Sequence, residues 1–206
     1  MSQPNSHPKT TAQTEANALV RELKTHGIIL GGLVGLLWAI AIVDLFLGGR
    51  LELLGIRPWS PSGLTGIFFA PFLHAGFRHL ISNTIPLVIL GWLILARDIQ
   101  EFIVVSAIAA LTSGVGTWLF GGLGTLHIGA SGVIFGYFGY LASYAWFERS
   151  VGSILVALLV LLTFGGMIWG ILPIQYGISW QGHLFGLLGG VLAARLVAWI
   201  NGASQS

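Results

Sequence analysis

The sequence predicts an all-α protein, a polytopic membrane protein built as a bundle of six transmembrane helices, and three observations support this prediction. Of the 206 residues, 55% are hydrophobic and only 8% are charged, whereas a soluble domain carries about 25% charged residues. Six apolar stretches each approach the roughly 20 residues that a helix needs to cross a bilayer. The 30 glycines are typical of helices that pack closely in lipid. The lipid bilayer is therefore the expected surroundings of most of the chain.

The six expected spans follow one another with mostly short connections, and they divide the chain into three parts. The spans are 27–47, 79–96, 102–120, 131–147, 153–172 and 180–200. Residues 1–26 are polar and are expected to form a flexible cytosolic tail, not a signal peptide, because the apolar stretch that follows is full length. Residues 27–200 form one domain by length, and residues 201–206 are a short C-terminal tail.

The distribution of basic residues predicts the orientation. Six spans place both termini on one side of the membrane. Basic residues that flank the spans on that side are Arg21, Lys24, Arg97, Arg149 and Arg195, whereas those on the other side all lie in the long first loop, at Arg50, Arg57 and Arg78. The positive-inside rule therefore favours cytosolic termini. The compact form favours the inner membrane of a prokaryotic cell.

Two other features bear on the shape of the chain. The first loop, 48–78, contains Pro and aromatic clusters that are neither fully polar nor periodic, so it is expected to dip into the membrane interface beside the bundle. Pro86 is expected to kink the second span, and Pro173 to help end the fifth.

Composition excludes several classes of function. Cysteine is absent, which excludes disulfides, a thiolate nucleophile and a cysteine metal site. The net charge of +2 is small and scattered, which argues against a nucleic-acid partner. The HExxH spacing of zinc proteases is also missing, and no cofactor or metal is expected.

Two polar residues stand where apolar spans begin. Ser131 follows Gly129-Ala130, and His183 follows Gly182 about fifty residues later. Polar groups inside a membrane mark functional sites by default, and a hydroxyl beside a base that can take its proton is the simplest device for nucleophilic hydrolysis. Ser131 and His183 are therefore the candidate nucleophile and general base.

Helix geometry predicts that these residues share one depth in the membrane with His79 and Asn83. At a rise of about 1.5 Å per residue, His79 and Asn83 lie roughly 27 and 21 Å above Arg97. By the same count, Ser131 and His183 lie roughly 26 and 27 Å above the cytosolic ends of their spans. In a hydrocarbon layer about 30 Å thick, all four fall into one layer below the outer surface.

Glycine spacing predicts that the fourth and sixth spans are neighbours. Gly132 and Gly136 repeat every four residues in the fourth span, as do Gly182, Gly186 and Gly190 in the sixth. Such stripes let helix backbones approach closely, although they are also common packing devices without chemistry. Because Ser131 and His183 lie beside the heads of these stripes, close packing would bring the hydroxyl and the imidazole within hydrogen-bond reach.

The remaining requirements for hydrolysis lie nearby. Ser131 is at a helix N-terminus, where free N–H groups favour a developing negative charge. His79 and Asn83 are four residues apart, hence on one helix face, and could donate hydrogen bonds to an oxyanion. No carboxylate lies at this level to serve as a third member, so the sequence predicts a two-residue dyad.

Three motifs together resemble the rhomboid family of intramembrane serine proteases, over about residues 27–200. They are HAGFRHLISN at 74–83, Gly-x-Ser-Gly at 129–132, and GHLFG at 182–186 with Gly190 after it. One departure is Thr65-Gly66, where many members carry a Trp-Arg pair in the first loop. Catalytically dead relatives usually lose the serine or histidine or have proline before the serine, whereas this chain has Ala130 there.

The resemblance implies a role for each matching residue. Ser131 would be the nucleophile and His183 the general base and then the general acid, while His79, Asn83 and the Ser131 N–H would form the oxyanion hole. The supporting positions would be Phe135, packed on the catalytic histidine, Gly129, in the turn before the nucleophile, and His74, in the loop that closes a water-filled cavity. Substrates would be single-pass transmembrane proteins that enter laterally between the second and fifth spans and are cleaved in or near their membrane segment.

Three other readings stay open. His79 and His183 could ligate a haem, or join His74 and His127 around a metal, although His127 is otherwise expected to be an interfacial residue. A channel or transporter would show ionisable groups crossing the midplane, and the lower halves of these spans have none. A catalytically inactive family member acting as a binding scaffold would share the whole fold.

Overall fold

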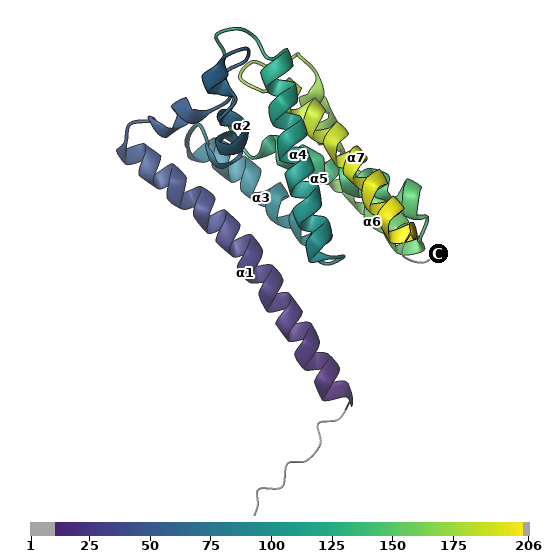
Figure 1. Cartoon of the computed structure of the whole chain (residues 1–206). Coiled ribbons are helices and arrows are strands. Elements are labelled where there is room, and N and C mark those ends of the chain that lie inside the picture. Colours follow the sequence, from purple (N-terminus) through teal and green to yellow (C-terminus); the bar gives the residue numbers. More distant parts are fainter. Residues whose placement is uncertain (1–10, 204–206) are drawn as a thin grey trace, which may run out of the picture.

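The structure, a computed structural model, describes residues 11–203 and confirms the all-α prediction (Figure 1). The long helices pack side by side, and no strand is present among the described residues. The α-helices are α1 (Thr11–Phe46), α2 (Gly66–Phe69), α3 (Gly76–Leu95), α4 (Ile99–Phe120), α5 (Ser131–Glu148), α6 (Val151–Phe164) and α7 (Trp180–Ala203). The 3-10 helices are η1 (Leu51–Leu54), η2 (Pro61–Gly63), η3 (Ala70–Phe72) and η4 (Gly165–Ile171).

Five helical segments are long and apolar enough to cross a membrane, and they match five of the six expected spans. They are Ala12–Phe46, Gly76–Leu95, Ile99–Phe120, Val151–Ile171 and Trp180–Gly202. The remaining expected span is α5, which lies in the middle of the bundle. It packs against α3, α4, α6 and α7, and ten of its 18 residues are buried, so it needs little lipid-facing surface.

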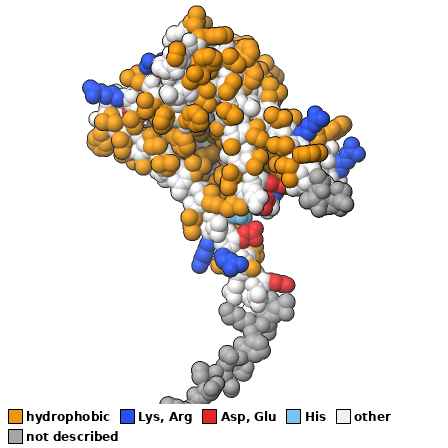
Figure 2. Space-filling model, in the orientation of Figure 1, with side chains coloured by type: hydrophobic (Ala, Val, Ile, Leu, Met, Phe, Trp, Pro, Cys, Tyr) orange, Lys and Arg blue, Asp and Glu red, His pale blue; other side chains and the backbone are white. Residues whose placement is uncertain are grey.

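The surface of the molecule agrees with a multi-pass membrane protein. Large exposed side chains on the outer helices are mostly leucine, isoleucine and aromatic residues, as on α6, where Leu155, Leu158 and Leu162 are exposed. On the face shown in Figure 2, hydrophobic side chains cover the body of the molecule, and Lys, Arg, Asp and Glu lie at its margins. Such a surface is solvated by lipid, not water.

The N-terminal tail is where the sequence prediction was wrong. Helix α1 begins at Thr11 instead of residue 27, so residues 11–26 continue the first span as a helix. They contain no glycine or proline and several strong helix formers, including Ala, Leu, Glu and Lys, and an established helix propagates easily into such a segment. Helix α7 likewise runs three residues past the expected end of the last span. The other tail residues, 1–10 and 204–206, lie outside the described part of the chain.

The fifth span also departs from expectation, because it is not one regular α-helix. Helix α6 ends at Phe164, and the 3-10 helix η4 carries the chain on to Ile171, shortly before Pro173. The glycine pair Gly165-Gly166 weakens the α-helix at this point. In the second span, by contrast, α3 continues through Pro86.

The first loop is folded onto the bundle and not extended into solvent. It contains η1, η2, α2 and η3, and its exposed aromatic residues include Trp59 and Phe68. Gly66 packs on the backbone of Gly55, where a Cβ atom would meet the Gly55 carbonyl. The loop is therefore anchored by close backbone packing.

The two glycine stripes meet as expected and bring α5 and α7 into contact. A Cβ atom on Gly186 would collide with the Gly132 carbonyl oxygen, and one on Gly190 would collide with the Gly136 carbonyl oxygen. Glycine is required here because backbone lies directly on backbone. The first turns of the two helices are thereby held side by side.

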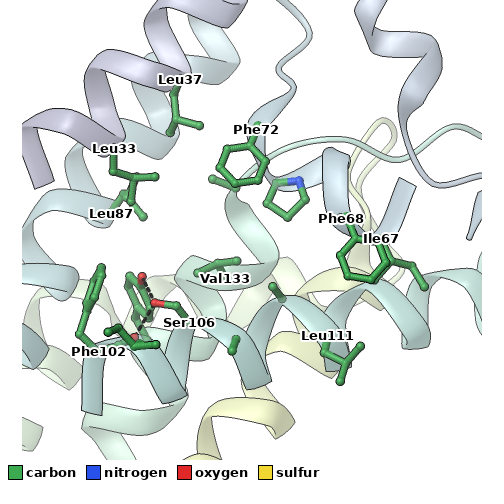
Figure 3. Close-up of a pocket in the computed structure, with 16 residues that line it drawn as sticks. Leu33, Leu37, Ile67, Phe68, Phe72, Leu87, Phe102, Ser106, Leu111 and Val133 are labelled. Atoms are coloured by element: carbon green, nitrogen blue, oxygen red, sulfur yellow. Dashed lines mark hydrogen bonds between the residues drawn. The ribbon is translucent and has the colours of Figure 1, made fainter. Parts of the chain in front are cut away.

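One packing gap lies between α1, α4 and the first loop. This cavity of about 630 Å³ is lined by apolar side chains, including those of Leu33, Leu87 and Val133 (Figure 3). The polar side chains on its wall are Ser106 and Tyr137, whose hydroxyl oxygens are hydrogen-bonded to each other at 2.6 Å. No described histidine, aspartate or glutamate lines this cavity to act as a base. The candidate catalytic residues therefore lie on the other side of α5.

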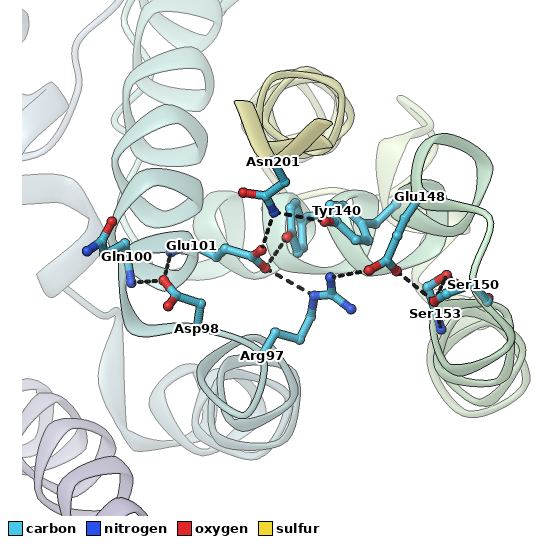
Figure 4. A network of polar contacts seen from close by, with 10 residues as sticks. Arg97, Asp98, Gln100, Glu101, Tyr140, Glu148, Ser150, Ser153 and Asn201 are labelled. Atoms are coloured by element: carbon cyan, nitrogen blue, oxygen red, sulfur yellow. Dashed lines mark hydrogen bonds and ion pairs between the residues drawn. The ribbon is translucent and has the colours of Figure 1, made fainter. Parts of the chain in front are cut away.

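A polar network joins the helices at the end of the bundle that carries the C-terminus (Figure 4). Glu101 accepts a 3.0 Å hydrogen bond from Arg97 Nε, a 2.5 Å bond from the Tyr140 hydroxyl and a 3.3 Å bond from the Asn201 amide. Arg97 also pairs with Glu148 at 3.3 Å. The network connects the α3–α4 loop, α4, α5 and α7.

Replacing Glu101 by alanine is expected to destabilise the protein by about 3 kcal/mol, because it leaves a half-buried arginine without its main partner. The free energy of unfolding in detergent micelles measures this effect. Gln100→Ala is the matched control, since this neighbouring side chain is exposed. Equal stability of the two variants would show that the network contributes little.

Candidate active site

A polar cavity of about 760 Å³ opens on the other face of α5. Ser131, His183, His79, Asn83 and Phe135 all line it. It extends between Ser82 and Pro86 on α3 and Met167 on η4. The four polar residues, which come from three helices, therefore line one cavity.

Ser131 is the first residue of α5 and follows a tight turn. Gly129, just before it, has a φ angle of +122°, a conformation that L side chains rarely adopt. A Cβ atom at Gly129 would also lie 2.7 Å from the His79 ring. Glycine is therefore needed twice over, for the backbone angle and for the close approach of α3.

The hydroxyl of Ser131 and the imidazole of His183 are in direct contact. The Ser131 Oγ atom lies 2.8 Å from His183 Nε2, and His183 Nδ1 lies 3.0 Å from the carbonyl oxygen of Gly170. A carbonyl can only accept, so Nδ1 carries the proton and Nε2 is free to accept from the serine. The ring is in the tautomer that a general base for Ser131 requires.

Two further contacts hold the His183 ring in place. The Phe135 ring stacks on it with centroids 4.1 Å apart and an interplanar angle of 10°. Gly170 belongs to η4, and a Cβ atom there would lie 2.8 Å from Phe135 and 3.1 Å from His183. The irregular end of the fifth span thus supplies the carbonyl that orients the imidazole, a role that the sequence did not reveal.

On the opposite side of Ser131, α3 presents two hydrogen-bond donors. The Asn83 amide nitrogen is buried and has no protein partner. The Ala75 N–H donates to His79 Nδ1 at 3.4 Å, so the ring proton is on Nε2, the atom that lies against the Gly129 turn. Both groups are available to a negative oxygen near the serine.

His74 lies in the loop just before α3. The family resemblance puts this loop at the cavity, and its residue Ala75 lines the cavity, whereas the His74 side chain is buried behind the turn before Ser131. Its Nε2 atom accepts a 3.4 Å hydrogen bond from the Ala130 N–H. Burial, helped by the neighbouring His79, lowers the pKa of His74 to about 4, which keeps the ring neutral and able to accept.

The sequence analysis did not place His127 in the site. Expected to be interfacial, it is half-buried on the cavity wall and bonded through both ring nitrogens, to Thr125 and Ser179. The sequence contains one indication of this position, because His127 precedes Ser131 by four residues and Ser179 precedes His183 by the same number.

The alternative of a metal centre finds no geometric support. Within residues 11–203, no group of three or more His, Cys, Asp or Glu side chains is arranged to hold a metal ion. The His74 ring contacts the His79 ring edge-on, with centroids 5.1 Å apart, but its Nε2 atom accepts from Ala130. His127 is bonded to two hydroxyls through its ring nitrogens.

The fold and the site together define a class: a multi-pass membrane protein with a serine–histidine pair in a polar cavity among its helices. Comparison with known families assigns it further. The model of the Rhomboid domain matches residues 61–200, and the chain belongs to the rhomboid family.

Bacterial relatives agree with this assignment. An uncharacterized protein of Mycobacterium tuberculosis is 43% identical over 173 residues, which cover 80% of this chain and 72% of that protein. One from Mycobacterium leprae is 38% identical over 194 residues, 90% of this chain and 76% of its own length. A Bacillus subtilis protein named as a candidate rhomboid protease, YdcA, is 34% identical over 134 residues, 60% of this chain and 62% of its own.

Proposed function

We propose that this protein is an intramembrane serine endopeptidase that cleaves single-pass transmembrane proteins in or near their membrane segment. The observation that carries the proposal is the 2.8 Å contact between Ser131 Oγ and His183 Nε2, with the ring tautomer set by Gly170. Membership of the rhomboid family supports the same reaction class.

The arrangement suits acyl transfer by a two-residue device. Ser131 attacks the scissile carbonyl while His183 Nε2 takes its proton, and the protonated ring then returns a proton to the leaving amine. The resulting negative oxygen is stabilised by the Asn83 amide, His79 Nε2–H and the N–H groups of the first turn of α5. Water then attacks the acyl-enzyme, with His183 again acting as base, and frees Ser131.

The path of the substrate follows from the position of the cavity. Its walls include Ser82 and Pro86 on α3 and Met167 on η4, which favours lateral entry of a substrate helix between the second and fifth spans. Helix α6 has few buried residues, namely Ser153, Ala157 and Val160. Displacing it therefore requires less free energy than displacing a central helix. With cytosolic termini, water reaches Ser131 from the outer side of the membrane.

Labelling with a serine-directed fluorophosphonate tests the proposal. The purified protein in detergent is expected to be phosphonylated, and its Ser131→Ala variant is expected to remain unlabelled. Ser82→Ala, on the same cavity wall, is the matched control and should label normally. If the wild-type protein neither labels nor cleaves any single-pass reporter, a catalytically inactive binding role replaces this proposal.

Replacing Asn83 by alanine is expected to lower the turnover of a reporter substrate by about 10–1000-fold, as for the loss of one oxyanion donor. The effect should fall on kcat more than on KM, because the donor is used fully only in the transition state. Turnover of the Ser82→Ala variant provides the reference. Unchanged turnover in Asn83→Ala would make Asn83 a structural residue.

A further inference from the structure

His127 joins the two segments that carry the dyad. Its Nδ1 atom lies 2.8 Å from the Ser179 hydroxyl and its Nε2 atom 2.7 Å from the Thr125 hydroxyl. Ser179 also accepts from the Gly182 N–H at 3.4 Å, and its carbonyl accepts from the His183 N–H at 3.1 Å. One imidazole therefore connects the loop before Ser131 with the first turn of the helix that carries His183.

The direction of each hydrogen bond in this chain can be deduced. The Thr125 hydroxyl donates to the Gly122 carbonyl at 2.6 Å, so its oxygen must accept the proton of His127 Nε2. His127 Nδ1 is then the acceptor, and it takes the Ser179 hydroxyl proton, which leaves the Ser179 oxygen to accept from Gly182. Each donor in this series of hydrogen bonds has an acceptor. Because Nδ1 accepts, the imidazole must be neutral. Burial lowers the pKa of His127, which favours the neutral ring.

The backbone of His127 is fixed as well. Its N–H and carbonyl pair with the carbonyl and N–H of Ile56 at 3.0 and 2.9 Å, which ties the segment to the first loop. A Cβ atom on Gly121 would lie 3.1 Å from His127 Nε2, so the ring is also packed against the end of α4. The imidazole cannot shift without moving one of these elements.

We infer that His127 is a positioning residue that sets the distance between Ser131 and His183 by bonding Ser179. The inference rests on the proposed proteolytic function. The Gly132–Gly186 and Gly136–Gly190 contacts hold the backbones of α5 and α7 together, and side-chain cross-links act beside them at the level of the first turns. His127–Ser179 joins the segments that lead into α5 and α7, and the 2.8 Å bond from the Ser113 hydroxyl on α4 to the Gly182 carbonyl holds the first turn of α7 from a third helix. A displacement of about 1 Å between reacting groups can cost 10²-fold in rate.

Four variants test this role: His127→Phe, which keeps a ring without hydrogen bonds; His127→Gln, which keeps one donor and one acceptor; Ser179→Ala; and the double variant His127→Phe/Ser179→Ala. The measurements are kcat and KM on a reporter substrate, the rate of fluorophosphonate labelling and the thermal midpoint. We expect His127→Phe and Ser179→Ala each to lower kcat and the labelling rate by about 10–100-fold with little change in KM. His127→Gln should recover most of the rate, and the double variant should be no slower than the slower single one.

Wild-type activity in the same assays separates this inference from the proposed function. An active wild type with an equally active His127→Phe variant would overturn the positioning role, as would a glutamine variant no better than phenylalanine. Loss of thermal stability with unchanged kcat in the folded fraction would also overturn it, because it would show a purely structural residue. If the wild type neither labels nor cleaves, the proposed function fails, and the inference falls with it.

Discussion

Replacing His183 by alanine is expected to abolish cleavage of a reporter substrate, lowering kcat by about 10⁴-fold or more. The imidazole is the one base in contact with Ser131 Oγ, and the described cavity wall has no carboxylate that could take over proton transfer. Fluorophosphonate labelling should be lost as well, because an unactivated serine hydroxyl is a weak nucleophile. Gel-based labelling and reporter cleavage, run side by side, measure both effects.

The control for this variant is another buried histidine. His26→Ala removes a side chain that is 6% exposed and packs edge-on against Trp92, with ring centroids 5.6 Å apart. It lies on α1, outside the polar cavity, so its activity should stay near that of the wild type. Retained cleavage in His183→Ala would contradict the dyad. Equal loss in both variants would point to a general effect of removing a buried histidine.

The features that were predictable from the sequence are those governed by helix geometry. The spans follow from apolar length, and a fixed rise per residue then sets the depth of each polar residue along its span. Ser131, His183, His79 and Asn83 could therefore be placed in one layer before any side chain was positioned. The four-residue glycine spacing predicted the close contact of α5 and α7 for a similar reason, because it reflects one helix face.

The features that escaped prediction depend on irregular backbone or on tertiary context. The Gly170 carbonyl that orients His183 comes from a 3-10 segment, whose position no periodic pattern gives. The motif places His74 in the loop beside the cavity, but it does not reveal the hydrogen bond that its side chain accepts from the Ala130 N–H. The N-terminal extension of α1 was missed because its residues are mostly polar, although their helix propensity is high.

Introducing a side chain at Gly186 is expected to lower both the stability of the protein and the labelling rate of Ser131, because it disturbs the packing of α5 against α7. A Cβ atom there would meet the carbonyl oxygen of Gly132, next to Ser131, and would lie 2.9 Å from the Gly132 carbonyl carbon. Backbone cannot move aside as the end of a flexible side chain can, so the helices must separate. Gly186→Ala should cost about 1–3 kcal/mol of stability and lower the labelling rate of Ser131 by about 10²-fold. Gly186→Val should leave little active protein.

Gly35 on α1 provides the matched control, because a Cβ atom there has nothing within 4 Å. Gly35→Ala should leave stability unchanged or raise it by up to about 1 kcal/mol, since alanine is the better helix former. Thermal midpoints and labelling rates of both alanine variants separate close packing from helix propensity. If Gly186→Ala labels as fast as Gly35→Ala, the contact between the stripes does not set the Ser131–His183 distance. In that case the cross-links at the first turns, including His127–Ser179, would have to hold the dyad together without help from the helix interface below.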